Sequence, residues 1–233
     1  MTERIVRTFQ PRRRSLSPAR MELFDRLEPL WCLADVGPTL IPADVFGRVA
    51  PLVLDIGIGI GDSTMAVALV EQNVDVIGID VHTPGIAASL ARIEADQLAN
   101  VRLVHGDALV FLRRLQSESL SGIRIYFPDP WPKIRHHHRR IVRDDVVTQL
   151  VERLQPGGWL HLATDIDDYA GQMLDVCERN PDLGGGVIAR PDSRPVTRYE
   201  KRGTEAGRTA TDLWYVNERL VSDTKRSGVR LIR

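Results

Sequence analysis

The chain of 233 residues has only two cysteines, Cys32 and Cys177, which lie far apart and form no CxxC pair. This usage excludes a disulfide-rich secreted scaffold and favours two reduced thiols in a cytoplasmic protein. No apolar run approaches the roughly 18 uninterrupted residues that a membrane span needs. Residues 1–7 include no apolar stretch of the kind found in secretory signals, so we expect a cytoplasmic protein without a membrane segment.

The chain also lacks a net charge, because 31 basic residues balance 31 acidic ones. The charges are nevertheless segregated. Residues 1–20 hold six arginines against one glutamate, residues 133–143 hold five cationic side chains and three histidines without an acid, and residues 225–233 hold four more cations. Because salt screens distant charges, such local patches can bind phosphate groups even on a neutral chain. We expect residues 1–20 to form a basic, flexible arm and residues 21–233 to form a single domain.

Short apolar runs alternate with helix-like segments from residue 51 onward. The runs predict strands at 51–57, 74–79, 101–104, 123–127, 159–163 and 213–220. The segments between them predict helices at 64–70, 83–98, 108–115, 143–154 and 166–179, with amphipathic residues 21–33 as a further helix and glycines 184–186 as a linker. This order indicates a doubly wound, mostly parallel α/β sheet.

Aspartates stand at or just after five of the predicted strand ends: Asp55, Asp80, Asp107, Asp129 and Asp165. The carboxyl ends of parallel strands share one edge of the sheet, and ligands of such sheets bind beyond that edge. The sequence therefore predicts an acidic ligand site there.

A glycine-rich loop, Gly57-x-Gly59-x-Gly61, follows the first of these strands and resembles a nucleotide-binding turn. Its third glycine comes one residue earlier than in G-x-G-x-x-G, so the motif alone is weak. Asp80 lies 19 residues after Gly61, close to the place of an acid that binds a ribose diol.

The ligand that suits this loop is a cation rather than a diphosphate. Asp55 and Asp62 flank the glycines, and repulsion of a pyrophosphate at about 4 Å would cost on the order of 4 kcal/mol at an effective dielectric near 20. S-adenosylmethionine carries a sulfonium and an ammonium, so carboxylates attract it, and we favour it over NAD. A loop that binds nothing is the alternative. Asp107 would suit an adenine amino group or, alternatively, cap the following helix.

The segment Phe-Pro-Asp-Pro-Trp-Pro-Lys at residues 127–133 is stiff, because three alternate prolines allow neither helix nor central strand. It would hold Asp129 and Trp131 rigidly at a strand end, with Trp131 either stacking on a base or packing beneath the turn. The cations that follow are predicted to bind phosphates: Lys133, Arg135, Arg139 and Arg140. Three adjacent histidines, 136–138, cannot readily converge on one ion, so no metal is predicted.

With these motifs, the chain resembles the bacterial tRNA (guanine-N7-)-methyltransferases over about residues 50–220. The resemblance is carried by residues 55–61, 78–85, 100–103, 107–108, 127–140, 163–165, 169–170, 197–203 and 212–213. It implies a Rossmann-like fold with a seven-stranded sheet, and transfer of a methyl group from S-adenosylmethionine to N7 of a guanine in the variable loop of tRNA. It also implies action without an obligatory protein partner, as a monomer or homodimer.

The resemblance implies roles for individual residues as well. Contacts to the cofactor fall on Asp55, Gly57, Gly59, Gly61, Asp80, Asp107 and Asp129, and Asp129 is also the catalytic carboxylate. Contacts to the substrate fall on Lys133, Asp165, Thr197, Arg198, Tyr199 and Glu200, where residues 197–203 would be a loop that closes over the base, or an ordinary turn. Tyr199 is a second candidate for stacking. The family more often has Glu at positions 55 and 80, so each reach is shorter here by one methylene.

Two alternatives remain at this stage. One is an S-adenosylmethionine-dependent methyltransferase that acts on another RNA or on a small molecule, and the arginine-rich segments argue against a small molecule. The other is a non-catalytic RNA-binding α/β module, and five strand-end aspartates make little sense in a module that binds only polyanions.

Overall fold

The structure, a computed structural model, describes residues 8–9 and 16–219. Most of the expected arm at 1–20 lies outside the described residues, as do the basic residues 225–233 and the predicted strand end at 220. The described part of the chain includes every residue to which the sequence assigns a contact with cofactor or substrate.

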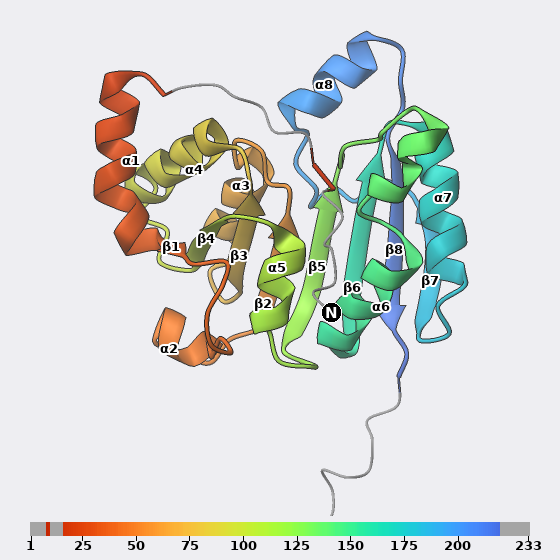
Figure 1. The fold of residues 1–233 in the computed structure, drawn as a ribbon, viewed down its shortest axis with the longest axis horizontal. Coiled ribbons are helices and arrows are strands. Elements are labelled where there is room, and N and C mark those ends of the chain that lie inside the picture. Colours follow the sequence, from red (N-terminus) through yellow and green to blue (C-terminus); the bar gives the residue numbers. More distant parts are fainter. Residues whose placement is uncertain (1–7, 10–15, 220–233) are drawn as a thin grey trace, which may run out of the picture.

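Eight strands of the described residues form one sheet in the order β1-β4-β3-β2-β5-β6-β8-β7 (Figure 1). They are β1 (Cys32–Leu33), β2 (Leu52–Ile56), β3 (Asp75–Asp80), β4 (Val101–His105), β5 (Leu120–Tyr126), β6 (Leu154–Thr164), β7 (Leu183–Ile188) and β8 (Thr211–Asn217). Strands β1 to β6 pair in parallel, and β8 pairs antiparallel with both β6 and β7. The predicted doubly wound, mostly parallel sheet is confirmed, and the two-residue β1 brings the count to eight instead of seven.

The expected linker at glycines 184–186 is wrong, because these residues form the middle of the edge strand β7. A Cβ on Gly185 would meet the carbonyl oxygen of Trp214 in β8 at 2.1 Å. Glycine therefore allows the two backbones to approach closely here, which is one of the roles of glycine inside a strand.

The helices of the described chain cover both faces of this sheet. They are α1 (Pro18–Trp31), α2 (Pro42–Phe46), α3 (Asp62–Val70), α4 (Thr83–Ala95), α5 (Ala108–Phe111), α6 (Asp144–Arg153), α7 (Asp167–Glu178) and α8 (Arg198–Glu205), with 3-10 turns η1 (Leu112–Arg114) and η2 (Ile134–Arg139). The predicted helix at 108–115 thus divides into α5 and η1, and the predicted loop at 197–203 is a helix. Within the described residues, no helix has the length and apolar character to cross a bilayer.

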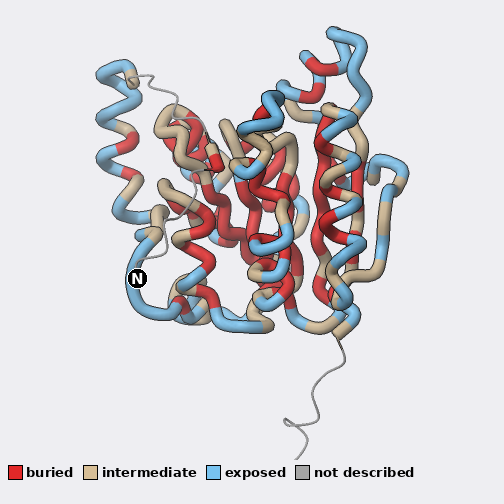
Figure 2. The backbone as a smooth tube through the Cα atoms, turned by 45° about the vertical axis from the view of Figure 1, so that its right-hand side comes forward, coloured by how far each residue is buried: buried red, intermediate tan, exposed pale blue. Residues whose placement is uncertain are grey.

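The side chains of the central strands point alternately to the two faces of the sheet, and the core therefore forms two apolar clusters. Leu52, Leu54 and Ile56 of β2 pack with residues of α5, α6 and α7, whereas Val53 packs with residues of α1, α3 and α4. Successive strand side chains point to opposite faces, so the two clusters lie on opposite sides of the sheet. The buried residues run through the middle of the molecule in Figure 2.

The first turn of α4 rests directly on the glycine loop. A Cβ on Gly85 would lie 2.0 Å from the carbonyl oxygen of Gly59. Because this neighbour is backbone, it cannot move aside without deforming the loop. Glycine at position 85 therefore sets the distance between α4 and the loop.

Replacing Gly85 by Ala should lower the free energy of unfolding by about 2 kcal/mol, the typical cost of overpacking a tight contact. Gly171 in α7 provides the control, because a Cβ there meets nothing within 4 Å. Gly171→Ala should raise stability by about 0.5–1 kcal/mol through helix propensity and a less flexible unfolded chain. Urea denaturation measures both changes, and equal effects of the two substitutions would contradict the close contact.

Candidate active site

A pocket of about 300 Å³ opens at the carboxyl ends of β2, β3, β4 and β5. Most of its described lining comes from five segments that are distant in sequence: residues 55–60 and 62–64, residues 79–82, residues 106–108, residues 125–130 and residues 197–199; Ile141 adds a single side chain. The last segment leads into α8, which lies above the strand ends in Figure 1. Residues 8 and 9 also line the pocket, which the sequence reasoning missed because it treated residues 1–20 as a flexible arm.

Four of the five strand-end aspartates meet in this pocket: Asp55, Asp80, Asp107 and Asp129. The fifth, Asp165, is 6% exposed and does not belong to the lining. It accepts a hydrogen bond of 2.8 Å from Nε of Arg208. Parallel pairing thus gathers the acids as expected, while Asp165 holds a charge partner of its own.

Asp55 is a buried carboxylate, 3% exposed, near the end of β2. Its Oδ2 accepts a hydrogen bond of 2.9 Å from the Thr64 hydroxyl, and Arg124 stands opposite it on β5. Burial raises the pKa of Asp55, and the nearby Arg124 charge and the Thr64 hydrogen bond offset only part of this effect. Burial dominates because the charged form loses its hydration.

Asp80, the last residue of β3, joins two loops. Its Oδ2 accepts from the backbone N–H of Gly59 at 2.6 Å, and its Oδ1 accepts from that of His82 at 2.8 Å. Burial raises the pKa of Asp80 in spite of these two donors. Each carboxylate oxygen can accept more than one hydrogen bond, so Asp80 can also accept a hydrogen bond from a ligand hydroxyl.

The three glycines of the loop are required by its backbone conformation. Gly57, Gly59 and Gly61 have φ values of 80°, 59° and 77°, a region that residues with a Cβ rarely adopt. The amides of Gly57 and Ile58 both donate to the carbonyl of Ile79, which fixes the loop against β3. A Cβ on Gly57 or Gly59 would meet nothing within 4 Å, so conformation rather than space selects glycine at these two positions.

Asp107 follows β4 and caps α5, because its Oδ1 accepts from the amide of Leu109 at 2.9 Å. This is the alternative role that the sequence left open. The residue also belongs to the pocket lining. Capping uses one acceptor of the carboxylate, so it is compatible with a contact to a ligand amino group.

Trp131 takes the packing role of the two considered from the sequence. It is 7% exposed, lies outside the pocket lining, and donates from Nε1 to the carbonyl of Thr8 at 3.0 Å. The guanidinium of Arg139 lies 3.8 Å from its ring centroid. Phe127 and Trp131 have positive φ values of 50° and 45°, so the proline-rich segment is sharply turned at both ends.

The cations after this segment divide into exposed and buried ones. Lys133 and Arg135 are exposed and Arg139 is half-buried. Arg140 is 1% exposed and donates to the Pro130 carbonyl, the Gln172 amide oxygen and the Asp168 carboxylate. This geometry argues against phosphate binding by Arg140, which stays a prediction, since its guanidinium already has three protein partners.

The described residues contain no group of three or more His, Cys, Asp or Glu side chains placed to hold a metal ion. Of the three adjacent histidines, His136 stacks on Trp131 with ring centroids 5.9 Å apart.

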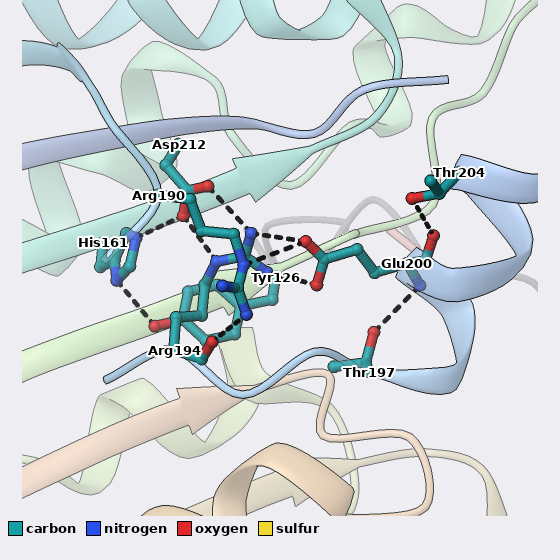
Figure 3. A network of polar contacts seen from close by, with 8 residues as sticks. All are labelled: Tyr126, His161, Arg190, Arg194, Thr197, Glu200, Thr204 and Asp212. Atoms are coloured by element: carbon teal, nitrogen blue, oxygen red, sulfur yellow. Dashed lines mark hydrogen bonds and ion pairs between the residues drawn. The ribbon is translucent and has the colours of Figure 1, made fainter. Parts of the chain in front are cut away.

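Residues 197–200 belong to a capped helix instead of the predicted loop. Thr197 accepts from the amide of Glu200 at 3.1 Å, an arrangement that the T-x-x-E pattern could have indicated. Thr197, Arg198 and Tyr199 line the pocket, whereas Glu200 is 7% exposed and pairs with Arg194 (Figure 3). The predicted substrate contact of Glu200 stays a prediction, and the structure argues against it because both carboxylate oxygens are bound within the protein.

An acidic pocket with a glycine loop on a parallel α/β sheet defines a class of enzyme. Residues 49–213 match the family model described as "Putative methyltransferase". The fold is similar to that of a 30S ribosomal A1408 methyltransferase from an uncultured bacterium, with a TM-score of 0.53 at 12% identity over 76% of this chain and 92% of that one. It is also similar to a 16S rRNA (adenine(1408)-N(1))-methyltransferase of Catenulisporales acidiphilia solved with cosubstrate SAM, with a TM-score of 0.52 at 13% identity over 77% and 92%. The protein is a methyltransferase of Rossmann-like fold.

Relatives with higher sequence identity identify the family within this class. The tRNA (guanine-N(7)-)-methyltransferase of Streptomyces coelicolor is 42% identical over 220 residues, which cover 91% of this chain and 81% of the relative. The enzyme of the same name from Nitrosomonas europaea is 41% identical over 212 residues, which cover 89% and 95%. The chain belongs to the tRNA (guanine-N(7)-)-methyltransferase family, and the family and fold class predicted from the sequence are confirmed.

Replacing Asp55 by Asn should raise the thermal midpoint of the ligand-free protein by a few degrees at pH 7. The folded-state pKa of Asp55 lies above its ordinary value of 3.8, so the ionised carboxylate destabilises the fold at neutral pH. The gain should shrink as the pH falls through the raised pKa and vanish below 3.8, where the carboxyl group is protonated in both states. Arg124 would keep Glu71 as an ion-pair partner at 3.7 Å.

Calorimetric melts of the two proteins between pH 3 and pH 7 measure this difference. The exposed Asp25 of α1 supplies the control, and Asp25→Asn should leave the midpoint unchanged across the range. A midpoint of Asp55→Asn below that of the parent protein at pH 7 would show that burial of the charge is not the dominant effect.

Proposed function

We propose that the protein transfers a methyl group from S-adenosylmethionine to N7 of a guanine in the variable loop of tRNA. The carrying observation is the pocket in which Asp55, Asp80, Asp107 and Asp129 surround a glycine loop at one edge of the sheet. When bound there, S-adenosylmethionine supplies an electrophilic methyl group on a sulfonium ion. The relatives named above bear the name of this reaction.

The charges of the pocket fit a cationic donor and disfavour a dinucleotide. Arg198 is the single arginine or lysine among the described lining residues, and it pairs with Asp62 at 3.4 Å. A pyrophosphate would therefore face carboxylates with little compensation, and like charges in a partly buried site repel strongly. A sulfonium and an ammonium would instead relieve the repulsion among the acids.

Different lining residues would contact different parts of the donor. Asp80, already placed by two backbone amides, would accept the hydroxyl groups of a ribose. Asp107 would accept the adenine amino group while it caps α5. Gly57 and Gly59 leave open space in the pocket where a side chain would stand. Asp55 and Asp129 would face the cationic end of the donor.

The acceptor requires little covalent help from the protein. Guanine N7 carries a free lone pair, so no base has to remove a proton, and catalysis relies on positioning and electrostatics. The product ring is cationic, and a fixed carboxylate beside it stabilises the developing charge. Asp129 suits this task because Pro128 and Pro130 hold it in the lining. Asp165 suits it less, because Arg208 already neutralises it.

The enzyme must take an accessible guanine from a loop or extrude one, since N7 faces the deep, narrow major groove of A-form RNA. Tyr199 is the better candidate to stack on it, because the residue is 45% exposed, lines the pocket, and lies 5.6 Å from the Phe127 ring. Such stacking contributes roughly 1–3 kcal/mol. Trp131 is buried against Thr8 and Arg139, so it packs within the proline-rich segment instead.

The purified protein should move a labelled methyl group from S-adenosylmethionine onto unmodified tRNA with a variable-loop guanine, and borohydride with aniline should cleave the product at that base. A tRNA with adenine at the same position serves as the control and should remain unlabelled. Asp129→Ala should lower kcat by about 10²–10³, a typical loss for one electrostatic contact in a transition state. Asp129→Asn should be similarly slow, because it keeps the shape and removes the charge.

Circular dichroism of both Asp129 variants should show an unchanged fold. Full activity of Asp129→Asn would remove the carboxylate charge from the mechanism. Absence of transfer to several such tRNAs by the parent protein would reject the proposed substrate.

The double substitution Lys133→Ala with Arg135→Ala should weaken tRNA binding and make its salt dependence shallower by about 2 in the slope of log K against log salt concentration. Both side chains are exposed, so the thermal midpoint should stay unchanged. Arg179→Ala is the control: this arginine is 57% exposed, follows α7 outside the cationic run, and already pairs with Asp144 at 2.9 Å. Filter binding at several salt concentrations measures the slopes, and an unchanged slope in the double variant would place the phosphates elsewhere.

A further inference from the structure

A chain of buried polar side chains links the middle of the sheet to α8 (Figure 3). The Tyr126 hydroxyl lies 2.7 Å from Nδ1 of His161, and Nε2 of His161 lies 2.8 Å from Oδ1 of Asp212. These three residues come from the neighbouring strands β5, β6 and β8. His161 and Asp212 are 3% and 2% exposed, so water does not substitute readily for these bonds.

The direction of each bond follows from the protonation states. Burial by itself would raise the pKa of Asp212, but the His161 hydrogen bond and the Arg194 charge outweigh it and hold the pKa below its usual value. Asp212 is therefore ionised and can only accept, so Nε2 of His161 donates to it. Burial raises the pKa of Tyr126, so its hydroxyl keeps the proton and donates to Nδ1. Donation from Nε2 and acceptance at Nδ1 of His161 satisfy both neighbours.

Arg194 continues the chain from the sheet to α8. Its Nη2 donates to Oδ2 of Asp212 at 2.9 Å, while Nη1 and Nη2 each donate to one carboxylate oxygen of Glu200 at 2.8 Å. Arg190 adds a second cation 3.3 Å from Glu200. Two arginines thus face two carboxylates, and the paired, forked bonds fix direction as well as distance.

One end of this chain, Tyr126, belongs to the pocket lining, and the other end, Glu200, directly follows lining residues. Tyr126 lies in the wall, and Thr197 and Tyr199 belong to the first turn of α8, where Glu200 is bound. Of the residues of α8, only Glu200 and Gly203 are buried, so no apolar stripe holds the helix against the domain. The position of the pocket roof therefore depends on the polar chain.

We propose that His161 is a positioning residue: through Asp212, Arg194 and Glu200 it fixes the first turn of α8, and with it Thr197 and Tyr199, over the bound methyl donor. The inference rests on the proposed function for the identity of the donor. It goes beyond that function because it assigns donor binding to a residue that lies outside the pocket and touches no substrate. It also assigns the positioning role to the hydrogen bond that Nε2 of His161 donates, and not to the ring as a whole.

The comparison of His161→Asn with His161→Gln tests this claim. The amide of Gln reaches the place of Nε2 and can still donate to Asp212, whereas the amide of Asn ends at the place of Nδ1. Loss of a hydrogen bond to a charged group should raise the Kd for S-adenosylmethionine about tenfold in His161→Asn. His161→Gln should stay within about twofold of the parent protein by the same reasoning. Titration calorimetry measures both values.

Hydrogen exchange of the backbone amides of 198–205 gives a second readout that needs neither donor nor tRNA. These amides should exchange faster in His161→Asn and at the parent rate in His161→Gln, while those of β2 and β3 stay protected in both. Equal behaviour of the two variants, or parent-like affinity and exchange in His161→Asn, would overturn the proposal. If His161→Asn does not fold, Arg194→Lys replaces it, since an ammonium cannot bridge both carboxylates with the same fork. Unchanged affinity and exchange in that variant would overturn it equally.

Methyl transfer to tRNA by the parent protein is measured separately. If the parent protein binds the donor but does not methylate tRNA, the proposed substrate is rejected and the positioning role of His161 is unaffected. Parent-like exchange of the α8 amides in His161→Asn would reject the positioning role, whatever the result with tRNA.

Discussion

Burial of carboxyl groups at the ends of β2 and β3 is the constraint on which the rest of the structure depends. A carboxylate without hydration is costly, and Asp55 and Asp80 carry raised pKa values for this reason. Their compensation comes from neighbours that the fold must supply: the Thr64 hydroxyl for Asp55, and the amides of Gly59 and His82 for Asp80. A loop that offers its amides to a carboxylate needs the left-handed turns that glycine allows. The buried acids therefore require the glycines of the loop.

The floor and the roof of the pocket are held by different forces. The floor consists of parallel strands whose apolar side chains are buried on both faces, so it is as rigid as the core. The roof is α8, which buries a glutamate and a glycine and is joined to the sheet by Arg194, Glu200 and Asp212. Polar bonds of this kind have strict directions but can re-form after opening. A site that must admit a donor and then a base benefits from a firm floor and a roof that can open.

The sequence predicted the features that periodicity encodes and missed those that depend on distant partners. Alternating apolar runs indicated the sheet, and strand ends indicated the acidic edge. The burial of Arg140 depends on Asp168 and Gln172, which lie 28 and 32 residues away, so its place in a cationic run could not reveal it. Glu200 pairs with Arg194, only six residues before it, but Arg194 is held in place by Asp212 of β8, which the local sequence does not indicate. Glycines 184–186 resemble a linker in sequence because the close approach of Trp214 exists only in three dimensions.

Opposite charges have to coexist in this enzyme, because the donor is a cation and the RNA is a polyanion. The acids line the pocket, and the exposed cations Lys133 and Arg135 follow the proline-rich segment that carries Asp129. Salt at physiological concentration screens exposed charges beyond roughly 8 Å, whereas buried pairs are screened far less. Under the proposed function, the acids would act on the donor from inside the pocket while the cations would act on phosphates at the surface. A stiff proline-rich connection keeps the two regions adjacent and separate, which is why a chain with no net charge can serve both ligands.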